Sequence, residues 1–408
     1  MLKMFISADW SKCPNKRAVY TADITNKHLR KREYPNSEGW NLKSLLELAR
    51  ELSRSGPVLI GVDVVLGVPR EYWELFMQDV PAAKPNSFVQ WLRGFDPNSD
   101  FFVSICKSPE KWSVSCPWFE VQTGTGGLKS FTTKVTGGMK RRLDLKTNAK
   151  PVFAVSGMPG VVGGATRIFW RELAECLAAN RRDFTIWPFE GTLPTLLSDS
   201  GIVVAETYPR LAYAAALSDI LITSKIDISH KTKNKQRNLE NMNLACCLLE
   251  RTKWVADKEI KLDDLNSAKQ SEDDFDALFT AAAVLRCSLE DIDIVAPDWV
   301  DSEIEGSMLL AGPVNPCSST KKLKEWMDDQ KAHISEFRSA IKIPLQTHEK
   351  SIYPCPIPGC EKEFHGSHSG WDTHVASPKK HPGWYPEISD GEERKKLFRQ
   401  DYNDWLQR

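Results

Sequence analysis

The sequence carries no excess charge of either sign, because its 54 Lys and Arg residues balance its 54 Asp and Glu residues. The average field of the molecule therefore attracts no polyanion, and a nucleic-acid partner would have to contact local basic segments. The sequence also lacks an apolar run near the roughly 18 residues of a membrane span, and Asp9 comes too early for a secretory signal. We therefore expect a cytoplasmic protein that makes no membrane contact.

Disulfide frameworks and nucleophilic triads are missing as well. The ten cysteines lack the spacing of a disulfide framework, which indicates that most of them are reduced core residues. We find no arrangement of Ser, His and Asp or of Cys and His that is typical of nucleophilic catalysis. The 408 residues are enough for one large domain with an appendage, or for two to three domains.

Acids occur at the ends of the two most apolar segments of the chain. The run from Val58 to Pro69 predicts a central strand that is buried on both faces, with Asp63 at its carboxyl end. The run from Met4 to Ala8 predicts a second strand, which is followed by Asp9. A lone buried carboxylate is costly unless a cation or hydrogen bonds receive it. Because ligands of open α/β sheets bind at such strand ends, we expect both acids at a binding site.

A helix expected from Asp274 to Arg286 adds two more acids. Asp273 and Asp276 are three residues apart, so their carboxylates can converge on one cation at the helix start. Helix capping explains Asp273 alone but not Asp276 as well. Hard cations such as Mg²⁺ take oxygen ligands, and two of them about 4 Å apart can activate water and stabilise the leaving oxygen of a phosphodiester. The acids therefore predict a site for Mg²⁺ or Mn²⁺, with two ions.

The order of the expected elements indicates an α/β fold. Two strands between residues 17 and 33 and a helix at 42–52 separate the two strands that end in acids. Three strands, a helix and a buried strand with an acid at its end form the opening order of an RNase H-like domain, a mixed sheet flanked by helices. Residues 70–180 are irregular and contain Trp-, Pro- and Gly-rich stretches, which indicates an insertion. A buried strand at 202–205 then delivers Glu206 in the way that the earlier strand delivers Asp63.

Two basic segments are candidates for contact with a phosphate backbone. Residues 129–150 hold seven Lys or Arg residues against one Asp, and a second basic run covers residues 225–237. A solvated loop is the alternative interpretation of both segments, and it is the more common one for a run such as the second. The candidate nucleic-acid contacts are Lys129, Lys140, Arg141, Arg142, Lys231, Lys233 and Lys235.

Short motifs follow one another in order over residues 1 to about 315. They are SADWS at Asp9, GVDVVLGVP at Asp63, RRLD at Arg141, KPVF at Lys150, GVVGGATR at Gly160, WPFE at Trp187, AETYPR at Glu206, DDFDALFTAAA at Asp273 and EGSMLLAGP at Glu305. This succession resembles a large bacterial family of predicted RNase H-like nucleases. The Asp-x-x-Asp-Ala-Leu pattern at Asp273 is also similar to the last catalytic helix of the Holliday-junction resolvase RuvC.

The resemblance implies a metal-dependent nuclease that hydrolyses phosphodiester bonds of DNA or RNA. The ligands that it implies for Mg²⁺ or Mn²⁺ are Asp9, Asp63, Asp273 and Asp276. Glu206 would be an ancillary ligand or would polarise the attacking water. Many such nucleases carry Glu where this chain has Asp63, and the shorter side chain favours a different metal spacing or a weaker site. The alternatives are a non-catalytic nucleic-acid-binding or adaptor protein on the same scaffold and a phosphotransferase of the sugar-kinase type.

A zinc-finger pattern lies near the C-terminus. The spacing Cys355-x4-Cys360-x13-His374-x6-His381 is close to that of a Cys2His2 finger, with His365 and His368 as alternative ligands. A module this short cannot build a sufficient hydrophobic core. Structural Zn²⁺ would therefore supply most of its folding free energy. Such a finger can bind nucleic acid or a protein partner. The expected domains are a nuclease domain at 1–315, a helical linker at 316–350, a zinc finger at 351–384 and a helical tail at 385–408.

Overall fold

The structure is a computed structural model that describes most of the first 312 residues and a few positions beyond them. The described residues are 2–79, 84–121, 131, 139–147, 149–156, 160–178, 182–221, 235–312, 352–355, 360, 363–365, 374, 393 and 397. The chain divides into two compact units, Met1–Phe337 and Arg338–Arg408, which we describe separately. The predicted linker at 316–350 lies outside the described residues, and so does the predicted tail at 385–408 apart from residues 393 and 397.

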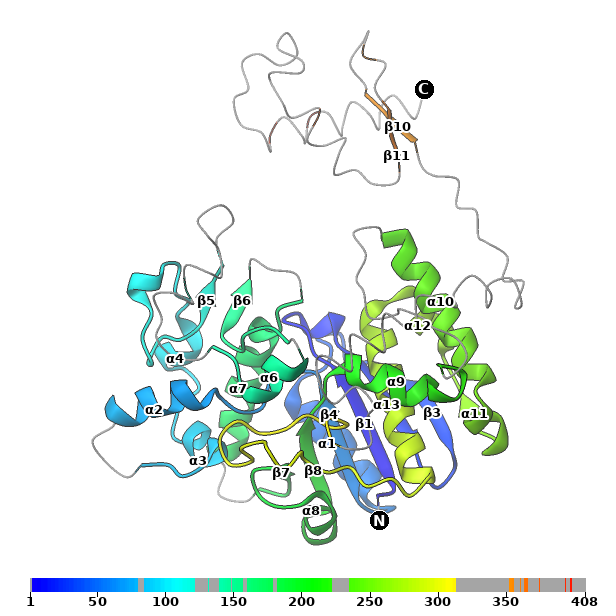
Figure 1. Cartoon of the computed structure of the whole chain (residues 1–408), viewed down its shortest axis with the longest axis horizontal. Coiled ribbons are helices and arrows are strands. Elements are labelled where there is room, and N and C mark those ends of the chain that lie inside the picture. Colours follow the sequence, from blue (N-terminus) through cyan, green and yellow to red (C-terminus); the bar gives the residue numbers. More distant parts are fainter. Residues whose placement is uncertain are drawn as a thin grey trace. The chain divides into compact units, whose positions relative to one another are not determined.

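A seven-stranded sheet forms the centre of the larger unit (Figure 1). Its strands run in the order β7-β8-β4-β1-β2-β3-β9, and β2 alone is antiparallel to its neighbours among the pairings described. The bounds are β1 Met4–Asp9, β2 Ala18–Asp23, β3 His28–Arg32, β4 Val58–Val62, β7 Thr185–Ile186, β8 Ile202–Glu206 and β9 Lys261–Leu262. The predicted α/β class with a mixed sheet flanked by helices is confirmed.

The register of the three central parallel strands brings their carboxyl ends to one edge. Ala8 of β1 lies opposite Val62 of β4, and Val62 lies opposite Glu206 of β8. The backbone N–H of Asp63 donates to the carbonyl of Ala8 at 2.9 Å, which continues the pairing by one residue. Asp9, Asp63 and Glu206 therefore reach the same edge, as expected for parallel strands that end together.

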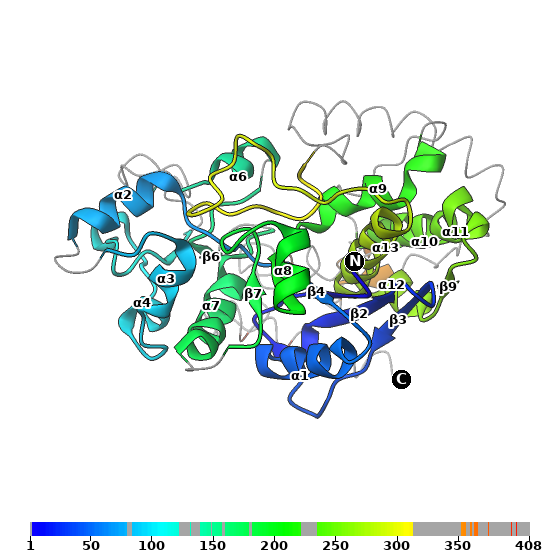
Figure 2. The ribbon, with the colours of Figure 1, turned by 90° about the horizontal axis from the view of Figure 1, so that it is seen from below.

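Helices cover both faces of the sheet, and Figure 2 shows α1 (Leu42–Ser53) and α13 (Glu272–Leu289) on opposite sides of it. The leucines of α1 share a core cluster with Met4, Ile6 and Ala8 of β1. Alternate residues of a strand face opposite sides, so Phe5, Ser7 and Asp9 lie on the other face. That face is covered by α13, which contacts β1, β2 and β3 and also α9 (Pro209–Leu221).

The predicted insertion at 70–180 contains several short elements and one long helix. The short helices are α2 Arg70–Asp79, α3 Phe88–Arg93, α4 Asp100–Val103 and α6 Arg142–Thr147, and β5 Phe119–Glu120 pairs with β6 Ala154–Ser156. The long helix α7 (Gly163–Ala178) packs against α1. This part of the predicted insertion therefore also supplies a helix to the layer that covers the sheet.

A buried carboxylate joins the inserted segment to a late part of the chain. Glu305 is 2% exposed, and its two carboxylate oxygens accept from the backbone N–H of Arg70 and of Arg142, each at 3.2 Å. These are the first residues of α2 and α6, whose N–H groups have no partner within their own helix. Gly67 has φ +117°, and a Cβ there would lie 2.2 Å from the Glu305 carbonyl oxygen. Only glycine fits this close approach. The hydrogen bond from Arg142 to Glu305 then holds the start of α6 beside the sheet edge.

The remaining helices of this unit are α8 Leu193–Asp199, α10 Lys235–Arg251, α11 Lys253–Asp257 and α12 Leu265–Gln270, with short 3-10 turns at Pro14–Lys16 and Pro109–Lys111. In the smaller unit, β10 Ile352–Pro354 pairs antiparallel with β11 Glu363–His365. Among the described residues, no helix is both long enough and apolar enough to span a membrane.

Candidate active site

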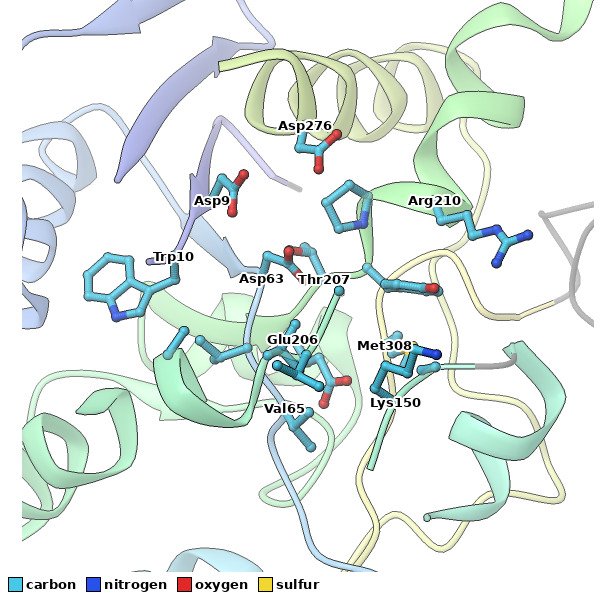
Figure 3. Close-up of a pocket in the computed structure, with 18 of the residues that line it drawn as sticks. Asp9, Trp10, Asp63, Val65, Lys150, Glu206, Thr207, Arg210, Asp276 and Met308 are labelled. Atoms are coloured by element: carbon cyan, nitrogen blue, oxygen red, sulfur yellow. The ribbon is translucent and has the colours of Figure 1, made fainter. Parts of the chain in front are cut away.

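A pocket of about 540 Å³ lies where the strand ends meet the start of α13 (Figure 3). All four predicted metal ligands line it. Its acidic lining residues are Asp9, Asp63, Asp144, Glu206, Glu272, Asp273 and Asp276. Side chains from β1, from the residue after β4, from β8 and from α13 thus meet in one cavity.

The position of each acid follows from local structure. Asp9 is the last residue of β1, and Asp63 directly follows β4. On α13, the Ser271 side chain caps the helix by accepting from the Asp274 N–H at 3.3 Å, which places Asp273 and Asp276 at or near the first turn. The positive end of the helix dipole favours carboxylates there. Figure 3 shows the carboxylates of Asp9 and Asp276 near one another, above Asp63.

Tyr213 on α9 forms a hydrogen bond with one of the acids. Its hydroxyl donates a hydrogen bond to Asp276 Oδ1. Burial raises the pKa of Tyr213 well above its ordinary value, and the charges of Asp276, Asp9 and Asp63 raise it further. The phenol therefore stays protonated and remains a donor at neutral pH. The hydrogen bond to Tyr213 restrains the orientation of Asp276.

The pocket leaves room for a hydrated cation. Within the described part of the chain, one group of three potential metal ligands has all its ligand atoms within 4.8 Å of one another. That group lies in the smaller unit and not in this pocket. The carboxylates of the pocket are therefore farther apart than the ligands of a metal site made of protein atoms alone. This suits Mg²⁺, which keeps several waters and takes one or two carboxylates plus oxygens of the substrate.

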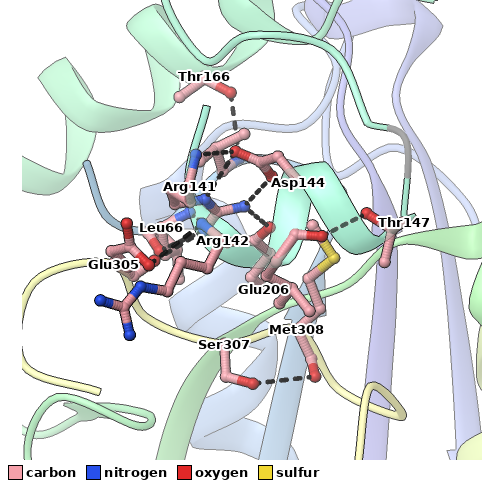
Figure 4. A network of polar contacts seen from close by, with 12 residues as sticks. Leu66, Arg141, Arg142, Asp144, Thr147, Thr166, Glu206, Glu305, Ser307 and Met308 are labelled. Carbon is pink, nitrogen blue, oxygen red and sulfur yellow. Dashed lines mark hydrogen bonds and ion pairs between the residues drawn. The ribbon is translucent and has the colours of Figure 1, made fainter. Parts of the chain in front are cut away.

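Glu206 is held by an ion-pair network beneath the pocket (Figure 4). Arg141 donates to both of its oxygens at 2.6 Å, and the Leu66 N–H donates to Oε2 at 2.6 Å. Arg141 also makes a two-point contact with Asp144, through Nε at 3.1 Å and Nη2 at 2.9 Å. Its remaining donor capacity is used by the carbonyls of Leu66 and Glu305. One guanidinium thus satisfies two buried carboxylates.

Burial and charge act in opposite directions in this network. Burial raises the pKa of Glu206, and the Arg141 guanidinium opposes that rise. Burial by itself would lower the pKa of Arg141, but Asp144 and Glu206 together raise it above its ordinary value. Arg141 therefore stays positively charged. Because both Glu206 oxygens are engaged by Arg141, the structure makes Glu206 the partner of a fixed cation at the wall of the pocket.

The predicted nucleic-acid contacts divide into different environments. The prediction for Arg141 is wrong, because the residue is 0% exposed and its guanidinium is fully engaged inside the protein. Arg142 is exposed and Lys140 is half-buried. Lys235 begins α10, and Lys129, Lys231 and Lys233 lie outside the described residues.

The predicted zinc ligands come together in the smaller unit. The ligand atoms of Cys355, Cys360 and His374 all lie within 4.8 Å of one another, and Cys360 Sγ is 3.4 Å from His374 Nε2. Cys355 and His374 are buried, at 8% and 9% exposed. Such a trio could bind a metal ion such as Zn²⁺. The predicted fourth ligand, His381, lies outside the described residues.

Comparisons with known proteins identify no relative. No protein-family model, no curated protein and no solved structure matches the chain. What the site can do is therefore argued from its own residues.

We expect Arg141→Met to destabilise the protein by about 3 to 5 kcal/mol, because it leaves the buried Asp144 and Glu206 carboxylates without their cation. Arg142→Met is the matched control. It removes the same charge from the exposed neighbouring side chain, so we expect a change within about 0.5 kcal/mol. Urea unfolding followed by tryptophan fluorescence measures both variants. Equal midpoints for the two would show that the network adds nothing to stability.

Proposed function

We propose that the protein is a metal-dependent nuclease that hydrolyses phosphodiester bonds of DNA or RNA on an RNase H-like scaffold. The observation that carries this proposal is the meeting of Asp9, Asp63, Asp273 and Asp276 in one pocket, although they come from opposite ends of the larger unit. Structural acids have no reason to gather in this way, because like charges in a shared cavity repel one another unless cations join them.

The arrangement of the sheet supports the scaffold. Its core order β8-β4-β1-β2-β3, with only β2 reversed, is compatible with an RNase H-like domain. The late helix α13 packs across β1 and brings its acids to the end of that strand. An RNase H-like sheet thus accounts for the position of each proposed ligand.

The residues of the pocket would have two roles, which are to bind the metal and to hold its ligands in place. Asp9, Asp63, Asp273 and Asp276 are the proposed ligands of Mg²⁺ or Mn²⁺. The bound metal would supply an activated water and would stabilise charge at the phosphate. Tyr213 would restrain Asp276 through its hydrogen bond. Such support from a neighbouring donor is common behind metal ligands.

One observation favours a second candidate function. Arg141 occupies both oxygens of Glu206, which leaves one acid fewer for metal ions at the end of β8. A non-catalytic nucleic-acid-binding or adaptor protein on the same scaffold would have this property. The two functions differ in whether a metal-dependent cleavage activity exists.

We propose that Cys355, Cys360 and His374, with His381 as the fourth ligand, bind structural Zn²⁺. Thiolates and imidazoles are the ligands of tetrahedral zinc sites. Cys355 and Cys360 lie between β10 and β11, and His374 follows β11, as in a Cys2His2 finger. The finger would hold nucleic acid or a protein partner for the nuclease domain.

We expect the purified protein to cleave labelled DNA or RNA in the presence of Mg²⁺ or Mn²⁺, and the double variant Asp9→Asn/Asp276→Asn to lose more than about 100-fold in rate. That factor is the upper range for removing a residue that only orients a ligand, so the loss of two ligands exceeds it. The assay uses single-stranded, duplex and branched substrates, each with and without EDTA.

Asp274→Asn is the matched control for that assay. Asp274 lies in the first turn of the same helix, but it pairs with Lys31 at 2.9 Å and does not line the pocket. We expect it to keep its cleavage activity. Cleavage that is equal in the wild type and the double variant would reject the nuclease proposal and favour the adaptor.

For the smaller unit, we expect about one Zn²⁺ per chain by elemental analysis, and its loss in Cys355→Ser because a hydroxyl is a poor substitute for a thiolate ligand. Cys13→Ser is the control, since Cys13 is an exposed free cysteine of the larger unit. A zinc content of zero in the wild type, or the same content in both variants, would contradict the zinc site.

A further inference from the structure

The candidate active-site pocket has basic side chains as well as acids. Lys12, Lys150 and Arg210 line it, and Figure 3 shows Lys150 and Arg210 on the side opposite Asp9 and Trp10. A site that held only divalent cations would gain nothing from these charges, because they repel the ions. Basic side chains beside acids in one cavity instead fit a ligand that carries negative charge and is held together with cations.

Arg210 is the second residue of α9, and its side chain lines the same pocket as Asp63. An anion bound beside Arg210 would therefore share this cavity with the proposed metal ligands.

Lys150 adds a second positive charge on the same side. It is exposed, and it makes no ion pair with any residue that the structure describes. An exposed amine at the edge of a cavity is stabilised when an anion binds beside it.

Asp144 and Glu206 already have a cation as their partner. Both line the pocket, but each makes a two-point contact with the buried Arg141. Arg141 therefore takes up charge that could otherwise attract Lys150 into an internal ion pair. Among the described residues, the amine of Lys150 therefore has no carboxylate as an ion-pair partner, and it can receive an anionic ligand.

We propose that Lys150 and Arg210 form a phosphate subsite, which binds a backbone phosphate of a nucleic-acid substrate across the pocket from Asp9. This subsite rests on the proposed nuclease function and names residues that would bind the substrate for it. Arg210 offers a planar pair of donors that matches two phosphate oxygens, and Lys150 offers a point charge. The acids would hold the metal ions, and Lys150 and Arg210 would fix the position of the phosphate.

The test is substrate binding measured apart from cleavage. Fluorescence anisotropy of a fluorescein-labelled single-stranded oligonucleotide, as DNA and as RNA, gives Kd in Ca²⁺ at several salt concentrations. We expect Lys150→Gln and Arg210→Gln each to weaken binding about 5- to 20-fold and to reduce the slope of log K against log salt by about 0.7 per cation removed. Arg210→Lys should keep the slope, because it keeps the charge.

Lys146→Gln is the matched control. Lys146 is an exposed lysine of α6 that does not line the pocket, so its loss should leave Kd and the slope close to those of the wild type. Circular dichroism melting of every variant shows that the fold is kept. If Lys150→Gln and Arg210→Gln bind like Lys146→Gln, or if the wild type does not bind the oligonucleotide, the subsite is refuted.

The cleavage assay separates this result from the proposed function. Metal-dependent cleavage together with unchanged binding by the Lys150 and Arg210 variants would refute the subsite and keep the nuclease. Weakened binding by these variants without any cleavage by the wild type would keep the subsite and refute the nuclease.

Discussion

The parallel pairing of β1, β4 and β8 is the constraint on which the site depends. Ala8 is opposite Val62, and Val62 is opposite Glu206, so the residues that follow or end these strands share one edge. A shift of one residue in either pairing would turn every side chain of a strand to the other face and would move its acid away from the others. Burial of the strands thus fixes the acids, and the same packing that stabilises the sheet forms the pocket.

Buried charge is distributed unevenly over this edge. Glu206 and Asp144 share the guanidinium of Arg141, and they form a fixed ion-pair network inside the wall of the pocket. Asp276 is restrained by a neutral donor, Tyr213, which adds no positive charge. Glu206 therefore stabilises the fold, whereas Asp276 keeps a negative charge that can attract a cation. Arg141 in turn lies against the Glu305 segment, so the late part of the chain holds the network in place.

Local sequence patterns were sufficient for the elements and for the acids, and insufficient for their partners. The apolar run after Pro57 predicts β4 and the place of Asp63, and the spacing of Asp273 and Asp276 predicts the start of α13; both strand and helix are confirmed. Arg141 was misread as a nucleic-acid contact, because a run of basic residues does not show which of them distant carboxylates surround. Tyr213 gave no signal, since a tyrosine within an apolar helix looks like an ordinary core residue. Both depend on contacts between residues more than 60 positions apart, which local periodicity does not encode.

The proposal that these acids bind divalent ions is tested most directly by locating the ions. Anomalous diffraction from crystals soaked in Mn²⁺ should show metal in the pocket, within coordinating distance of Asp9, Asp63 and Asp276, and no metal there in Asp9→Asn/Asp276→Asn. Saturating Mn²⁺ that binds only elsewhere on the protein, or that leaves this pocket without an anomalous peak, would contradict the proposed metal site.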